Sequence, residues 1–256
     1  MAWPGKRGHG RSRAAEGLAE WGRARVTALL VDDPRLPFAD RAHIATREAA
    51  AAVMGDKPRP ADLLALAAEA AVLAESLAPE SRRLEPPQRP IACRAGCGHC
   101  CHTIVMAIPA EVLRLAAHIQ RRFTPAARAA LIERLRAVAA VAPPERLAAR
   151  MACPMLADDR CTVYEARPLK CRGLESMDVE VCKRGARGEA VEVPVYAAHH
   201  RLFDRVLSGL IVGAIEAGRP DERLDLVRGL LIALETPDAA RRWLAGEPVF
   251  ATARLE

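Results

Sequence analysis

The eight cysteines of this 256-residue chain fall into two sets of four, and this grouping constrains the fold more than any other feature. Cys93, Cys97, Cys100 and Cys101 lie within nine residues, and Cys153, Cys161, Cys171 and Cys182 follow at wider spacing. A closed zinc site takes four ligands, and a cubane iron–sulfur cluster also takes four cysteines. The spacing therefore predicts two cysteine-rich segments with enough thiolates for two saturated metal sites.

Two other uses of cysteine compete with metal binding. Cysteines that only pack should lie on the apolar stripes of helices, whereas these eight lie in segments interrupted by glycine and proline. A redox dithiol or a disulfide set is the stronger alternative, but an extracellular disulfide framework needs export, and no apolar signal segment follows the basic start. Basic residues beside the cysteines favour thiolates, which are the metal-binding form: Arg94, Arg160, Lys170, Arg172 and Lys183.

The composition predicts a mainly α-helical protein. Apolar residues make up 51% of the chain, mostly alanine, leucine and valine, while aromatic residues make up only 4%. Alanine and leucine are strong helix formers, so we expect a helical bundle with an irregular cysteine-rich metal-binding segment and at most short β-strands. The expected organisation is a flexible basic N-terminus at 1–13, an N-terminal helical region at 14–90, a cysteine-cluster core at 91–198 and C-terminal helices at 199–256.

Hydrophobic periodicity and helix-capping signals place individual elements along the chain. Helices are expected at 14–31, 39–54, 62–78, 109–122, 124–138, 199–217, 221–234 and 238–246. The proline-rich stretch that begins at Pro79 is expected to end its helix, because proline interrupts a helix interior. Within the poorly helical stretch 152–198, residues 161–164 and 191–195 read as short strands, the second confined to a sheet edge by Pro194.

Residues other than cysteine were weighed as ligands or supporting groups. His99 and His102 flank the cysteine pair, but with eight thiols available we expect them in supporting or surface roles. His199 and His200 are expected to face solvent or cap a helix, and His43 and His118 to be structural. Tyr164, Arg167 and Arg172 have a better claim to a supporting role, since a guanidinium can donate hydrogen bonds to sulfur. Ordinary surface salt bridges are the alternative for these three residues.

The spacing of Cys93, Cys97 and Cys100 is also that of radical S-adenosylmethionine enzymes. Those enzymes use a barrel of alternating strands and helices, and this chain lacks the β-branched strand runs that such a barrel requires. His99 also stands where that superfamily usually has an aromatic carbocycle. The sequence therefore disfavours this class.

The formal net charge of +6 is weak evidence for a nucleic-acid partner. Two zinc ions bound by eight thiolates would lower the formal charge to about +2. Basic residues are scattered at helical spacing and are not gathered with stacking aromatics, so we expect no nucleic-acid binding. No apolar run is long enough for a membrane span. A cytoplasmic location is the expected default, and thiols there stay reduced.

The cysteine motifs resemble a known family. CRAGCGHCC at 93–101, followed by CPMLADDRCTVYEARPLKCR at 153–172, resembles the YkgJ-type cysteine-cluster family, a zinc- or iron-chelating domain. The resemblance implies metal ligands at Cys93, Cys97, Cys100, Cys101, Cys153, Cys161 and Cys171, with Tyr164, Arg167, Pro168 and Arg172 in support. Cys182 lies outside the core pattern and is added because of its local chemistry.

Two functions remain open on the sequence alone. The first is a binding module that chelates zinc or iron in a structural or metal-handling role and leaves room for a protein partner. The second is an iron–sulfur enzyme that modifies a protein or peptide, or a redox protein, since the family also resembles flagellin lysine N-methylase. No catalytic residue is predicted, and no glycine-rich nucleotide loop follows a strand.

Overall fold

The computed structural model describes residues 26–30 and 32–255, and this part of the chain is mainly α-helical. The predicted N-terminus at 1–13 and most of the helix predicted at 14–31, with Leu18 and Trp21, lie outside the described residues. The helices are α2 (Phe38–Met54), α3 (Pro60–Leu84), α4 (Pro109–Arg122), α5 (Pro125–Ala139), α6 (Pro143–Ala148), α7 (Leu169–Arg172), α8 (Val179–Ala186), α9 (Ala197–Glu216), α10 (Leu226–Glu235) and α11 (Ala239–Leu244). The predicted fold class is confirmed.

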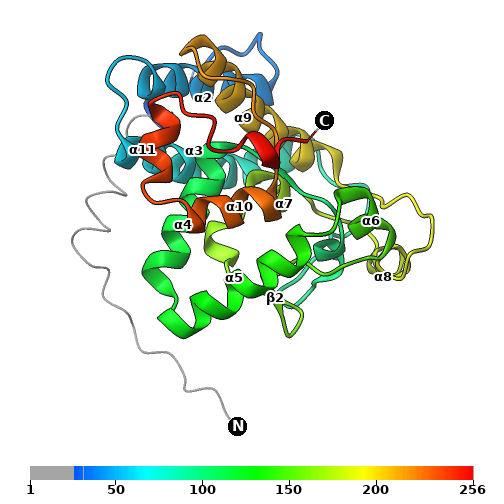
Figure 1. The fold of residues 1–256 in the computed structure, drawn as a ribbon. Coiled ribbons are helices and arrows are strands. Elements are labelled where there is room, and N and C mark those ends of the chain that lie inside the picture. The colour runs from blue at the N-terminus through cyan, green and yellow to red at the C-terminus, as the bar shows by residue number, and fades with distance from the viewer. Residues whose placement is uncertain (1–25, 31, 256) are drawn as a thin grey trace, which may run out of the picture.

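Helices from both ends of the chain form the main core. Figure 1 shows α2 lying beside α9, with α3 beneath them, and α3 in turn packs against α4. Gly209 of α9 permits the close approach, because a Cβ atom there would lie 2.5 Å from the carbonyl oxygen of His43 in α2. The N-terminal and C-terminal helices therefore contact each other directly, by apolar packing and by polar contacts such as the hydrogen bond from the Thr46 hydroxyl to the Val206 carbonyl.

Helix α3 runs to Leu84, so the prediction that the helix ends at Pro79 is wrong. Proline removes one helical hydrogen bond, but contacts beyond Pro79 hold the last turns in place. The Ser81 side chain is buried, the Arg82 guanidinium lies 2.7 Å from the Glu175 carboxylate, and the Tyr196 hydroxyl donates to the Glu85 carbonyl. Tertiary contacts outweigh the local cost of one proline.

Helix α10 begins at Leu226 and not at Asp221 as predicted. Strand β4 (Leu224–Asp225) pairs antiparallel with β1 (Met106–Ala107) just before the helix. The Asp225 carboxylate then caps α10 by accepting the backbone N–H of Arg228 at 2.9 Å. An apolar stripe continues from strand into helix here, so periodicity alone did not separate the two elements.

The segment between α6 and α9 contains little regular structure. Strands β2 (Leu156–Ala157) and β3 (Arg160–Cys161) form a hairpin. Asp158 and Asp159 have positive φ at its turn, as a two-residue hairpin of this type requires. The predicted strand at 161–164 stops at Cys161, because residues Tyr164–Ala166 form a 3₁₀ helix. The strand predicted at 191–195 is reduced to a single bridge between Val195 and Ser176.

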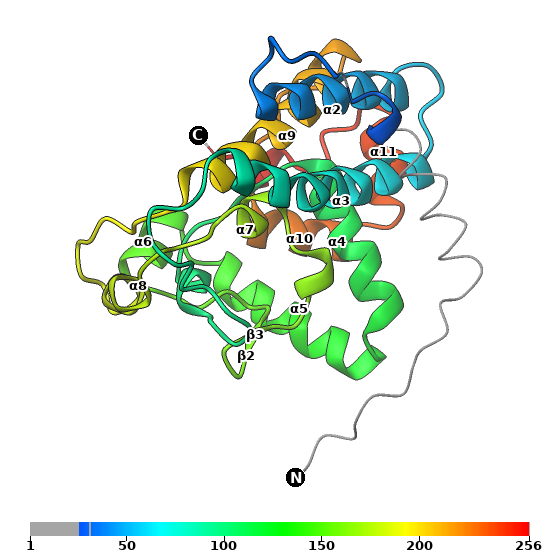
Figure 2. The ribbon, with the colours of Figure 1, turned by 180° about the vertical axis from the view of Figure 1, so that it is seen from behind.

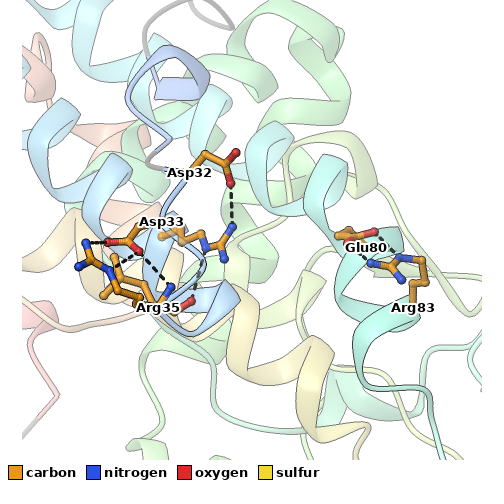
Figure 3. Close-up of polar contacts among 7 residues, drawn as sticks. Asp32, Asp33, Arg35, Glu80 and Arg83 are labelled. Atoms are coloured by element: carbon orange, nitrogen blue, oxygen red, sulfur yellow. Dashed lines mark hydrogen bonds and ion pairs between the residues drawn. The ribbon is translucent and has the colours of Figure 1, made fainter.

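Figure 2 shows that α8 and the β2–β3 hairpin lie on the side of the molecule away from α2 and α11. Exposed ion pairs such as Asp33–Arg35 near α2 and Glu80–Arg83 on α3 lie at the surface of the helical region (Figure 3). Such solvated pairs contribute little to stability. Among the described residues, no helix has both the length and the apolar character that crossing a bilayer demands.

Candidate metal centre

The two cysteine segments contact each other directly. The backbone N–H of Cys153 donates to the carbonyl of Cys101 at 2.7 Å, which joins the second segment to the first. A second link runs from the N–H of Ala92 to the carbonyl of Ser176 at 2.9 Å. The N–H of Ser176 also donates to the sulfur of Cys93 at 3.2 Å. Cysteines that are far apart in the sequence therefore occupy one region of the fold.

Seven of the eight thiols line one cavity of about 710 Å³. These are Cys93, Cys97, Cys100, Cys101, Cys153, Cys161 and Cys171. Cys182, on α8, is absent from the lining but lies within electrostatic range of Cys97 and Cys100. All eight are free thiols. The fold therefore gathers every cysteine that the sequence singled out, and none is used in a disulfide.

Neighbouring sulfurs and burial set the pKa values of these thiols. A hydrogen bond from Cys101 lowers the pKa of Cys100 to about 7, and the same bond raises the pKa of Cys101 because it favours the protonated donor. Burial raises the pKa of Cys153 to about 11 and that of Cys171 further. The lowered pKa makes Cys100 the thiol that ionises most readily among these four. A metal ion that binds the thiols with raised pKa values must displace their protons.

Arg167 and Arg172 lie beside the thiols, as the resemblance implied. The positive charges of both lower the pKa of Cys161, although burial is the larger effect and raises it. Arg167 also lies within electrostatic range of Cys100, and its buried Nε has no hydrogen-bond partner among the described residues. Tyr164 also lines the cavity. It is 56% exposed, and its ring supports the Arg167 guanidinium at 3.9 Å from the ring centroid.

The short helix that carries Cys171 is held from two sides. Nε of Arg172 donates to the Arg167 carbonyl at 2.8 Å, and its other nitrogens bond the Glu165 carbonyl and the Glu75 carboxylate of α3. Glu111 of α4 is buried, and its carboxylate accepts the N–H of Leu169, the first residue of α7, at 2.7 Å. The position of Cys171 therefore depends on α3 and α4.

The histidines contribute less than the thiols, with one difference from expectation. His99 and His102 begin and end the 3₁₀ helix that contains Cys100 and Cys101, and neither lines the cavity. His200 does line it and is partly exposed. The prediction that His199 faces solvent or caps a helix is wrong. His199 is buried, and its Nε2 contacts the carbonyl of Arg172 at 3.1 Å, because α9 begins two residues earlier and turns this ring inward.

The donor set fits a thiophilic metal ion. Thiols surround one cavity, and the unpartnered Nε of Arg167 is a donor that a metal-bound thiolate would satisfy. In the described part of the chain, no three histidine, cysteine or acidic side chains already converge closely enough to hold an ion. Binding therefore requires the cysteine sulfurs to move toward a common centre.

Residues 92–190 match the CxxCxxCC family. The description of that family model reads "Putative zinc- or iron-chelating domain". The match confirms the recognition of a cysteine-cluster chelating domain, and it includes Cys182 as well as the seven cysteines of the core pattern. Neither the curated proteins nor the solved structures gave a match to the chain.

Sequence reasoning missed several residues that organise the region matched by this family model. Glu111 lies in the first turn of α4, where an acidic residue indicates only a helix start, and it fills that role by accepting the Ile108 N–H at 3.2 Å. Ser176 gave no sequence signal, since only the fold brings it to Cys93. The same is true of Arg146 and Asp225, a buried ion pair in the cavity wall 2.5 Å apart, with side chains 3% and 2% exposed. Long-range placement cannot be read from local pattern.

Proposed function

We propose that residues 92–190 chelate zinc or iron with thiolates from both cysteine segments, up to eight in all. The observation that supports this is the gathering of seven free thiols around one cavity, with Cys182 beside it. A metal bound by four cysteines is closed, which favours a structural or metal-handling role over catalysis. We infer that the ligands are Cys93, Cys97, Cys100, Cys101, Cys153, Cys161, Cys171 and Cys182.

The role of Arg167 and Arg172 in this proposal is to balance charge. A zinc ion with four thiolates carries a formal charge of −2, which a low-dielectric site must offset. Arg167 lies near Cys100 and Cys161, and its free Nε is available as a donor to sulfur. Tyr164 keeps the guanidinium in place. The metal supplies cross-links between the segments, and these residues stabilise the thiolate form of its ligands.

The test is metal analysis of protein purified without oxygen. We expect zinc or iron at stoichiometric level; colourless protein would indicate zinc and a brown sample an iron–sulfur cluster. In Cys161→Ser, metal content and melting temperature should both fall, because the variant lacks one hairpin thiolate. Ala157→Ser, exposed in the same hairpin, is the matched control. Unchanged metal content and melting in Cys161→Ser would contradict the proposal.

We further propose that the domain works in the cytoplasm, where thiols remain reduced, with the metal ion as its ligand and no nucleic acid. Its function would be either to stabilise the fold or to hold a metal ion for a protein partner. Pull-down of the metal-loaded protein against the metal-free protein, followed by mass spectrometry of the bound fraction, tests the second role. Equal partner recovery from both forms would favour a purely structural ion.

A further inference from the structure

The cysteines divide into two groups by their neighbours, and the division differs from the order in the sequence. The outer group is Cys93, Cys97 and Cys182, which lie within electrostatic range of one another. In the inner group, Cys153 and Cys161 lie within electrostatic range of each other and of both Cys101 and Cys171. Cys100 neighbours both groups, so it lies between them.

The inner group is attached to the packed core. Cys171 lies on α7 between buried Leu169 and Arg172, and this helix is held by Glu111. Cys153 is hydrogen-bonded through its backbone to Cys101. Opening this group would break contacts with α3 and α4, and elements with many buried contacts open rarely.

The outer group is attached weakly. Cys93 and Cys100 are the exposed cysteines of the eight. Cys182 lies on α8, a helix with no buried residue in which Asp178 provides the N-terminal cap. The main packing partner of α8 is the 3₁₀ helix of residues 99–102, itself part of the cysteine cluster. Apart from hydrogen bonds at Ser176 and the Asp178 cap, this group has few contacts that would hold it closed without metal.

We propose that the cysteines form two metal sites that exchange at different rates. Cys101, Cys153, Cys161 and Cys171 retain an ion that stabilises the fold, while Cys93, Cys97 and Cys182, with Cys100 as fourth ligand, hold an exchangeable ion. This inference rests on the proposed function and adds a role to it. Ligand exchange at a closed thiolate site needs access for the incoming ligand, and the two exposed cysteines, Cys93 and Cys100, both belong to this proposed outer site. The outer site is thus the place where metal would enter or leave the protein.

The experiment is zinc release from the intact, zinc-loaded chain to excess 4-(2-pyridylazo)resorcinol, followed by absorbance. We expect two equivalents of zinc released in two phases, the fast phase at least about tenfold faster than the slow one. Cys182→Ser should remove or further accelerate the fast phase and leave the slow phase unchanged. Val181→Ser, the neighbouring position on α8, introduces the same hydroxyl without removing a thiol and should behave like the parent protein.

A second measurement does not depend on any variant folding. Iodoacetamide labelling of the loaded protein during partial zinc removal, mapped by mass spectrometry, should modify Cys93, Cys97 and Cys182 before Cys153 and Cys171. Uniform labelling, release in one phase, or a single bound equivalent would overturn the two-site division while leaving chelation intact. Absence of bound metal in the parent protein would instead overturn the proposed function itself.

Discussion

The helical frame and the cysteine region of this molecule are held together by different means. The frame consists of α2, α3, α4, α5, α9 and α10, and its facing sides are lined by buried aliphatic residues. The cysteine region, residues 92–103 and 152–198, contributes few of them, chiefly Met155, Val163 and Leu169. Folding any segment costs conformational entropy, which apolar burial offsets in the frame. In the cysteine region, under the proposed function, bonds to metal would supply much of the compensating stabilisation.

The largest effect is expected from metal removal, which should unfold the cysteine region and leave the helical frame folded. Structural zinc contributes about 10–16 kcal/mol in zinc-finger peptides, comparable with the stability of a whole domain. We expect chelation to expose amides of residues 152–198 to hydrogen exchange, while α2 and α9 stay protected because their apolar and polar contacts do not involve the thiols. Hydrogen-exchange mass spectrometry with and without chelator measures this. Equal loss of protection in both regions would show that the frame also depends on the metal.

The second largest effect is expected from acidification, which should weaken metal binding. Burial raises the pKa values of the Cys153 and Cys171 thiols, so they are protonated at neutral pH without metal, and an incoming ion must displace those protons. The apparent affinity should fall about tenfold per pH unit for each proton displaced. Titrations between pH 8 and pH 6, with proton release followed by an indicator dye, measure the slope. Affinity independent of pH would exclude thiolates as the principal ligands.

The sequence predicted the frame well, since its signals are local. Proline at the first turn and threonine as a cap placed α4 and α5 within a residue or two. Prediction failed where distant contacts decide the outcome, as at Pro79, which remains inside α3, and at Asp221–Asp225, which precede α10 as extended chain. The residues next to Pro79 in the sequence do not reveal the distant residues that hold the last turns of α3 in place.

The candidate site was predictable in its residues and not in its arrangement. Cysteine chemistry and spacing identified all eight thiols, and the structure places them together. Nothing in the spacing shows that Cys182 neighbours Cys93 and Cys97, because that contact depends on how α8 folds back. The contact between Glu111 and α7 was equally unpredictable. A residue in the first turn of a helix needs no further explanation, and only the fold shows that its carboxylate accepts the Leu169 N–H.

A change at the α2–α9 contact tests the frame alone. In Gly209→Ala the new methyl group would overlap the Thr46 hydroxyl and the His43 carbonyl, and we expect destabilisation of about 1–3 kcal/mol or more. Metal content should not change, because the contact is remote from the thiols. Gly229→Ala in α10 is the control. Its methyl group finds ordinary contacts at 3.4 Å, so the variant should be neutral or slightly stabilised. Thermal melting and metal analysis distinguish these outcomes.

Glu111 joins the two regions, so its replacement should affect both. In Glu111→Gln one acceptor oxygen becomes a donor that faces a backbone N–H, at Ile108 or at Leu169. We expect a loss of about 1–3 kcal/mol, the cost of a buried unsatisfied donor. Zinc release from the inner cysteines should also accelerate. Glu133→Gln, an exposed change on α5, is the control for removing one carboxylate. Normal release kinetics in a destabilised Glu111→Gln protein would limit this residue to a purely structural role.

The smallest effect is expected from removing the N-cap of α5, a helix of the frame. The Thr124 hydroxyl accepts the N–H of Ala127 at 3.2 Å, and Thr124→Ala removes that acceptor. Loss of an N-cap costs about 1 kcal/mol, lowered here because solvent can replace the bond at an exposed site. Thr124 begins α5, whereas the residues that link this helix to the cysteine region lie near its other end: Arg134 donates to the Pro154 carbonyl, and Val138 lines the cavity. Metal content and both release phases should therefore match the parent protein, even as the melting temperature falls by a few degrees. Altered release kinetics would mean that frame stability reaches the thiols through α5 and α10, which would weaken the contrast between the two regions.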